Sequence, residues 1–243
     1  MSQYRSIGGI LRSSLIVNEK KKHSASVIFA HGIGERGQLW ADIIETIQSK
    51  GNQHIKFICP NSLVEPVSKY YDYPIRSWFN YSRLGQEDRK SLDFSAAAIL
   101  SIIDNEVQNN NIHPERIIVG GFGQGGALAL YSFFNGGYSL GGCFTLSGYL
   151  PLNHSFKNVI LDSVNIKNPL LMLHGDQDEL IDLSIGQQSF DFLKNKGCTN
   201  SEFIIYKDLG DGVCPKEIDD ISIFLNNKLP NLNKIPKFEN VNK

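Results

Sequence analysis

Three short segments hold residues whose types and spacing could support acyl-transfer chemistry. The turn HGIGERG at residues 31–37 could direct backbone N–H groups at an oxyanion. The run GFGQGG at residues 121–126 follows an apolar stretch and precedes a helical pattern, which is the context of a nucleophile elbow, G-x-S-x-G. A third turn, HGDQD at residues 174–178, offers the carboxylate of Asp178. At the centre of the elbow pattern, however, stands a glycine, Gly123.

Each of these turns follows a short apolar run, and such runs alternate with helical patterns along the chain. Strand-like runs lie at residues 26–30, 55–59, 116–119, 143–146, 170–173 and 202–206, and helical periodicity at 39–47, 92–107, 127–134, 185–193 and 217–225. This alternation predicts an α/β fold with a mostly parallel central sheet and helices on both faces. Ligands of such sheets bind at the carboxyl ends of the strands, so the turns should meet at one edge.

Length and charge restrict the classes of function. The chain has 243 residues, with 24 basic and 25 acidic side chains, and 41% of its residues are hydrophobic. This composition predicts a single domain over residues 1–229, followed by a polar tail at 230–243 that is partly disordered. The balanced charge predicts no nucleic-acid partner. No apolar run approaches the ~18 residues of a membrane span, so we expect no stable membrane insertion.

The cysteines and the first residues predict a cytoplasmic protein. Cys59, Cys143, Cys198 and Cys214 are dispersed without C-x-x-C spacing, which favours reduced thiols over disulfides or a zinc site. The first residues lack the apolar core of a signal peptide. Because the cysteines do not have the spacing of a metal site, we also expect no metal, and no cofactor.

At six places the sequence resembles the acyl-protein thioesterases, a family within the phospholipase/carboxylesterase group of α/β-hydrolases. The segments that carry the resemblance are VIFAHGIG at 27–34, FICP at 57–60, SWF at 77–79, residues 116–131, LSGYLPL at 146–152 and HGDQD at 174–178. The resemblance implies an α/β-hydrolase fold. For a typical member it also implies removal of long acyl chains from S-acylated proteins, or hydrolysis of lysophospholipids and small esters.

The resemblance also assigns site residues. It implies Asp178 as the triad acid, the backbone amides of Ile33 and Gln124 as oxyanion donors, Gly123 at the nucleophile position and Asp211 at the base position. Gly123 has no side chain to attack a carbonyl, and Asp211 is not the imidazole that the mechanism uses as its base. All six histidines precede Asp178, whereas this fold supplies its histidine after the acid. Two of the three triad members are therefore missing.

Three interpretations remain open. The favoured hypothesis is a pseudoenzyme that retains acyl-chain or acylated-protein binding, with S-acylated proteins, lysophospholipid-like ligands or an active relative as partners. The alternative is an active thioesterase or carboxylesterase that uses Ser147, Cys214 or a water activated between Asp178 and Asp211. The third is that both replacements are sequence errors, since each lies one nucleotide from a Ser or His codon.

Further expectations concern the surroundings of the site. Trp78, Phe79, Tyr149 and Leu150 are candidates for the wall of an acyl groove. The aromatic segment 61–88 is expected to be a long irregular loop over the active face. An aspartate in the place of the histidine would face Asp178, so that one of the two carboxyl groups has a raised pKa. The histidines at positions 31 and 174 are interpreted as structural.

Overall fold

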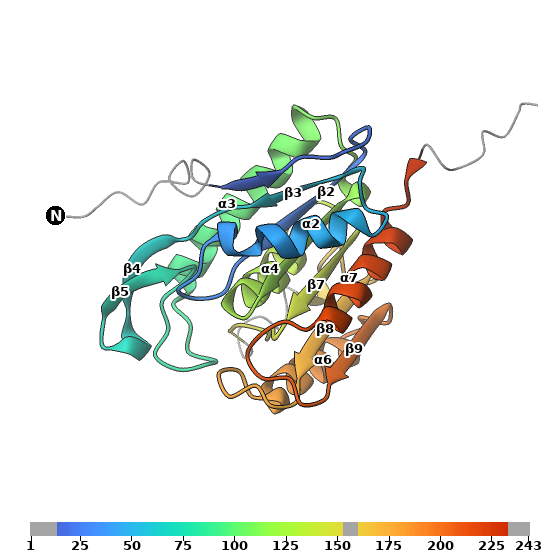
Figure 1. The fold of residues 1–243 in the computed structure, drawn as a ribbon. Coiled ribbons are helices and arrows are strands. Elements are labelled where there is room, and N and C mark those ends of the chain that lie inside the picture. Colours follow the sequence, from blue (N-terminus) through green and yellow to red (C-terminus); the bar gives the residue numbers. More distant parts are fainter. Residues whose placement is uncertain (1–13, 153–159, 233–243) are drawn as a thin grey trace, which may run out of the picture.

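A seven-stranded sheet forms the centre of the computed structural model, which describes residues 14–152 and 160–232 (Figure 1). Its strands are β1 (Leu15–Val17), β2 (Ala25–Ala30), β3 (Ile55–Cys59), β6 (Ile117–Phe122), β7 (Gly142–Leu146), β8 (Leu170–Gly175) and β9 (Ser201–Tyr206). Their spatial order is β1-β3-β2-β6-β7-β8-β9, and every neighbouring pair is parallel except β1 with β3. The predicted α/β fold with a mostly parallel sheet is confirmed. The short strand β1 was not predicted.

Helices cover both faces of the sheet. They are α2 (Ala41–Ser49), α3 (Arg89–Gln108), α4 (Gln124–Asn135), α6 (Leu183–Asn195) and α7 (Pro215–Lys228). One buried apolar cluster joins α2 and α7 to one face, and a second joins α3, α4 and α6 to the other. Because both faces are covered, β2, β6, β7 and β8 are buried along their whole length, which explains why they read as continuous apolar runs.

The registers of the parallel strands bring the expected turns to one edge. Ala30 at the end of β2 pairs with Gly121 in β6, and Phe122 at the end of β6 pairs with Leu146 in β7. At the other side of β8, Gly175 pairs with Tyr206 at the end of β9. The segments that follow these strands therefore emerge side by side.

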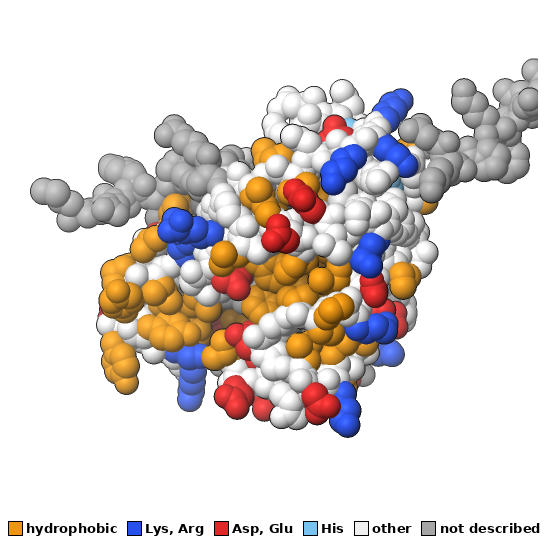
Figure 2. Space-filling view, in the orientation of Figure 1, with side chains coloured by type: hydrophobic (Ala, Val, Ile, Leu, Met, Phe, Trp, Pro, Cys, Tyr) orange, Lys and Arg blue, Asp and Glu red, His pale blue; other side chains and the backbone are white. Residues whose placement is uncertain are grey.

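Segment 61–88 was predicted to be irregular, and this prediction is wrong for its first half. β4 (Leu63–Val67) and β5 (Tyr73–Ser77) pair as an antiparallel hairpin that projects from the main sheet (Figure 1). Its surface is apolar: Val64, Tyr71 and Tyr73 are 54%, 98% and 68% exposed. Figure 2 shows apolar side chains gathered over this hairpin and continuing across the centre of the same face. The β-branched and aromatic residues of the two strands, such as Val64, Val67 and Tyr73, were the available signal.

Two other expectations bear on the periphery of the chain. Within residues 14–152 and 160–232, no helix is long and apolar enough to cross a membrane. The tail at 230–243 lies outside the described residues from position 233 onward, so its disorder stays a prediction, as do the domain boundaries.

Candidate active site

Gly123 forms a sharp turn between β6 and α4. Its backbone angles are φ 54° and ψ −116°, a region that costs a residue with a side chain about 1–3 kcal/mol. Its N–H donates to the carbonyl of Leu146 at 2.8 Å, and its carbonyl accepts from the N–H of Ala127 at 3.1 Å. A Cβ atom added at Gly123 would meet only Ile181, at 3.7 Å. The turn has the shape of a nucleophile elbow, with room at its apex for a side chain that is absent.

Two neighbouring glycines let this elbow approach β2. A Cβ atom on Gly125 would lie 2.1 Å from the carbonyl oxygen of Ala30 and 2.4 Å from that of His31. A Cβ atom on Gly121 would lie 2.3 Å from the carbonyl oxygen of Gly125. The obstructing atoms belong to the backbone and cannot move aside. Glycine is therefore required at both positions, and it places the N-terminus of α4 against the turn that follows β2.

The turn after β2 is held by a buried histidine. The ring Nδ1 of His31 donates to the carbonyl of Gly32 at 2.7 Å, and its Nε2 accepts from the N–H of Ser62 at 3.0 Å. A ring nitrogen that accepts a hydrogen bond carries no proton, so this imidazole is neutral. Burial lowers the pKa of His31 to about 4, although the bond to Gly32 opposes this shift. His31 is thus structural, as predicted.

The side chain of Gln124 joins the elbow to the segment after β5. Its Oε1 accepts from the N–H of Trp78 at 2.9 Å, and its Nε2 donates to the carbonyl of Phe79 at 2.8 Å. The indole Nε1 of Trp78 donates to the carbonyl of His31 at 2.8 Å. These bonds fix the backbone on both sides of the expected oxyanion site.

A small cavity of about 70 Å³ opens in front of Gly123, and we call it the elbow cavity. Ile33 and Gln124, the expected oxyanion donors, line it, as does Asp211. The full lining is Gly32, Ile33, Glu35, Lys69, Tyr70, Tyr81, Leu84, Phe122, Gly123, Gln124, Tyr149, Leu180, Ile181 and Asp211. Within the described part of the chain, this lining includes no serine, threonine, cysteine or histidine. The cavity therefore brings the elbow and the oxyanion turn together without an ordinary nucleophile or base.

Asp178 lies in the turn after β8 and keeps one oxygen without a partner. Its Oδ1 accepts from the N–H groups of Leu180 and Ile181, both at 2.9 Å. Its Oδ2 is buried and accepts no hydrogen bond from the residues that the structure describes. The Nε2 of His174 is 3.7 Å from this oxygen but donates instead to the carbonyl of Ile181 at 2.7 Å. His174 is thus a structural residue, and Asp178 is held in place with a free acceptor.

Asp211 lies in the loop between β9 and α7. Partial burial raises its pKa, and the negative charges of Asp178 and Glu35 raise it further. Asp178 and Asp211 are therefore within electrostatic reach of each other, and one carboxyl group of the pair has the raised pKa that the sequence predicted. The side chain of Asp211 is only partly buried, so solvent weakens this repulsion.

Glu35 is a site residue that sequence reasoning missed. Its Oε2 accepts from the N–H of Gly32 at 2.8 Å and from the indole of Trp40 at 2.9 Å. The carboxylate thereby closes the glycine-rich turn and adds a second negative charge to the elbow cavity. A carboxylate three residues after Gly32 was the available signal, since this spacing lets a side chain reach back to a backbone amide.

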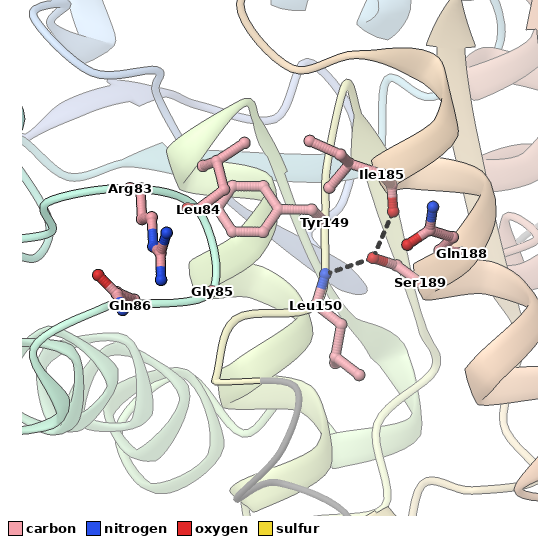
Figure 3. A pocket seen from close by; sticks show the side chains of 9 residues that line it. All are labelled: Arg83, Leu84, Gly85, Gln86, Tyr149, Leu150, Ile185, Gln188 and Ser189. Carbon is pink, nitrogen blue, oxygen red and sulfur yellow. Dashed lines mark hydrogen bonds between the residues drawn. The ribbon is translucent and has the colours of Figure 1, made fainter.

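A larger cavity of about 370 Å³ adjoins the elbow cavity, and we call it the Arg83 cavity (Figure 3). Leu84 and Tyr149 line both cavities, so their side chains form the shared wall. The other lining residues of the Arg83 cavity are Arg83, Gly85, Gln86, Leu150, Ile185, Gln188 and Ser189. The loop at 83–86 belongs to segment 61–88, which was expected to lie over the active face, but none of its residues was named as a site residue.

The expected groove residues divide into two pairs. Tyr149 and Leu150 line the Arg83 cavity, and Tyr149 also lines the elbow cavity. Trp78 and Phe79 line neither; they are 2% and 1% exposed and belong to the core between α3 and the sheet. For these two residues the expectation of a groove wall is corrected, because the hydrogen bonds to Gln124 and His31 direct them inward.

Neither expected substitute nucleophile faces a cavity. Ser147 is 2% exposed and lines neither cavity. Cys214 also lines neither, and it begins α7, where its N–H donates to the carboxylate of Glu217 at 2.9 Å. Among the described residues there is also no cluster of three His, Cys, Asp or Glu side chains that could hold a metal ion.

Comparisons with known proteins agree with this geometry. Residues 11–229 match the Phospholipase/Carboxylesterase family. Acyl-protein thioesterase 1 homolog 1 of Dictyostelium discoideum is 44% identical over 225 residues, which cover 91% of this chain and 98% of that protein. Acyl-protein thioesterase 1 of Emericella nidulans is 33% identical, with 90% and 96% covered. The crystal structure of Zea mays acyl-protein thioesterase 2 superposes with a TM-score of 0.80 at 32% identity, covering 89% of this chain and 98% of that one.

Proposed function

The chain belongs to the phospholipase/carboxylesterase family of α/β-hydrolases, and from this premise we propose that it binds long acyl chains without hydrolysing their esters. The observation that carries the proposal is the elbow itself. Gly123 occupies the apex with φ 54° and space above it, and no hydroxyl or thiol of a Ser, Thr or Cys among the described residues lines the cavity in front of it.

The absence of a base in the described site supports the same proposal. Asp211 is near Asp178, and the two carboxylates repel each other. Because both groups are acids, Asp211 does not replace the histidine that would pass a proton from the nucleophile to the leaving group. Removing the nucleophile or base of a serine hydrolase costs roughly 10⁶ in kcat. The oxyanion hole and binding alone leave about 10³ to 10⁴ over the reaction in water.

Retained binding is supported by the lining of the two cavities. The elbow cavity presents apolar surface to a ligand. This surface comes from the shared wall and from Tyr81, Phe122, Leu180 and Ile181. Each CH₂ group of a ligand that is buried on such a surface contributes ~0.8 kcal/mol. S-acylated proteins and lysophospholipid-like molecules carry such chains, and we propose them as ligands because the relatives are acyl-protein thioesterases.

Two further parts of the proposal concern the cell. We propose a cytoplasmic location, which is supported by four free cysteines in the described structure. We also propose an active relative as a functional partner, since a chain that binds acyl groups without consuming them would compete with it for the same substrates.

One observation favours a second candidate function, hydrolysis by water. A carboxyl group with a raised pKa, Asp211, lies near the buried carboxylate of Asp178. In such a pair one carboxylate can take a proton from an attacking water while the protonated partner gives a proton to the leaving group. The elbow amides would hold the oxyanion.

The test is turnover of a palmitoyl thioester reporter by the purified protein and three variants. We expect no turnover above buffer for the natural chain. The double variant Gly123→Ser, Asp211→His should hydrolyse the reporter at least about 10³-fold faster than the natural chain. Each single substitution should remain close to the natural chain, because triad members act as a unit. Far-UV circular dichroism controls for folding.

Turnover by the natural chain would contradict the proposal. If that turnover fell in Asp178→Asn and in Asp211→Asn, the water mechanism would replace it. If it fell instead in Ser147→Ala or Cys214→Ala, the affected residue would be the nucleophile. Failure of a fluorescent fatty acid to bind the natural chain would remove the binding half of the proposal.

A further inference from the structure

The Arg83 cavity has polar groups on two opposite rims and apolar groups between them. Figure 3 shows Arg83 and Gln86 together on one rim, with Gln188 on the opposite rim. Leu84 and Tyr149 lie between them, toward the elbow cavity. A cavity of about 370 Å³ with this lining offers a ligand both a polar end and an apolar path.

Arg83 is available to a ligand. It is exposed, and none of the described residues forms an ion pair with it. Its neighbour in sequence, Glu87, is buried and engaged elsewhere. Oε1 of Glu87 accepts from the N–H of Gly85 at 2.7 Å, and Oε2 accepts from the N–H of Leu152 at 2.9 Å. The guanidinium therefore keeps its N–H groups for an outside anion.

The elbow cavity carries the opposite charge. Glu35 and Asp211 line it; partial burial raises the pKa of Asp211, and repulsion from Asp178 and Glu35 raises it further. One cation, Lys69, also lines it, but its ammonium lies over the rings of Tyr70 and Tyr81, 5.8 and 5.5 Å from their centres. An anion beside Gly123 would therefore face two carboxylates and one ammonium that already lies over two rings, whereas an anion in the neighbouring cavity would face an arginine that has no ion pair with any described residue.

From this charge pattern we propose that the two cavities bind a single-chain amphiphile with an anionic head group, the head at Arg83 and the chain passing Leu84 and Tyr149 into the elbow cavity. The inference rests on the proposed function, since it requires that acyl chains bind here. It specifies the ligand as a single-chain molecule with an anionic head group rather than a neutral thioester. It also reverses the orientation of a hydrolysed ester, whose carbonyl would lie at the elbow.

Two kinds of head group share the required chemistry. A carboxylate and a phosphate both accept paired hydrogen bonds from a guanidinium. The side-chain amides of Gln86 and Gln188 line the same cavity and can donate to further oxygens of the head group. A free fatty acid would supply the carboxylate, and a lysophosphatidate would supply the phosphate.

The first experiment compares ligands with the same chain, each below its critical micelle concentration. Palmitate, 1-palmitoyl lysophosphatidate and the neutral 1-monopalmitoylglycerol are titrated against the full chain by calorimetry. We expect at least one anionic ligand to bind about tenfold more tightly than the neutral one, and the tighter of the two anions identifies the head group. Equal binding of all three would overturn this inference and leave acyl binding intact. No binding of any would overturn both.

The second experiment removes the arginine. Arg83→Gln should weaken binding of the preferred anion about tenfold and leave monopalmitoylglycerol unchanged within about twofold. Lys90→Gln is the matched control, because Lys90 is an exposed cation nearby that lines neither cavity. Unchanged anion binding in Arg83→Gln, or equal loss in both variants, would contradict the placement of the head group.

A third measurement tests the orientation. The pKa of bound palmitate, carrying ¹³C in its carboxyl group, can be read by NMR. A head group beside Arg83 should have a lower pKa than it has in Arg83→Gln. A head group beside Glu35 and Asp211 would instead have a raised pKa that falls in Asp211→Asn, and that result would overturn the proposed orientation.

Discussion

The two sides of the elbow cavity differ in the part of the chain that supplies their chemistry. On the elbow side, formed by the turns after β2 and β6, it comes from backbone shape and amides. On the carboxylate side, formed by the loops after β8 and β9, it comes from the side chains of Asp178 and Asp211. The elbow side is maintained by packing that the fold requires in any case, whereas one substitution can change the carboxylate side. Catalytic groups can thus disappear while the geometry around them stays.

The largest effect that would sharpen this contrast comes from adding one methyl group to the elbow side. Gly125→Ala should destabilise the protein by at least about 3 kcal/mol, because its Cβ would lie 2.1 Å from a backbone oxygen. Gly123→Ala is the matched variant and should cost only about 1–3 kcal/mol, since its Cβ is unobstructed and the backbone angles alone are unfavourable. Urea unfolding measures both. Equal losses of stability in the two variants would show that the contact between Gly125 and β2 does not hold the elbow.

The elbow side should also lose stability in acid. The pKa of His31 is about 4 in the folded protein against an ordinary 6.5, so the unfolded chain binds more protons between these values and stability falls as pH drops through this window. The difference amounts to about 3 kcal/mol. His31→Asn should be less stable than the natural chain at pH 7.5, and this gap should shrink by about that amount at pH 4. A constant gap would mean that the folded and unfolded chains protonate this imidazole equally, so that its pKa is not lowered by folding.

The N-terminus of α7, which follows the loop that carries Asp211, should respond to pH in the opposite direction. Burial raises the pKa of Glu217 to about 7, against an ordinary 4.5. The folded protein therefore binds more protons between these values, and stability falls as pH rises. Glu217→Gln keeps an oxygen for the N–H of Cys214 and should raise stability at pH 8 by about 1–3 kcal/mol, with no change at pH 4. If the difference in unfolding free energy between the two proteins were the same at pH 4 and pH 8, the prediction would be wrong.

The smallest expected effect concerns the exposed carboxylate. Asp211→Asn removes repulsion from Asp178 and Glu35, so Tm should rise slightly at pH 7. The rise should vanish in acid, where Asp211 is already protonated, and should shrink in high salt. Asp208→Asn is the control, because Asp208 is exposed in the same loop but lines neither cavity. An equal rise in the control would assign the effect to the net charge of the protein.

The sequence predicted features that depend on local pattern and missed those that depend on packing. Alternating apolar runs located six strands and five helices, since burial on both faces imposes that pattern. The hairpin escaped because the segment is rich in turn residues and each of its strands contains a proline, Pro66 in β4 and Pro74 in β5, which argues against a strand. Trp78 was placed in the groove because its type suits an acyl chain, and only its bond to His31 shows that it faces the core. Arg83 gave no signal, because its role depends on what lies across the cavity.

The close contact between Gly125 and β2 also affects which positions of the elbow pattern change during evolution. Once selection for hydrolysis is relaxed, the codons for positions 123 and 211 can change with little penalty. Those for Gly121 and Gly125 remain under selection for folding, since any larger residue would push the elbow off the sheet. The outer letters of the elbow pattern therefore outlast its centre. A pattern search that scores those glycines will still retrieve such chains as hydrolases, and within the elbow pattern only the middle letter shows whether a nucleophile is present.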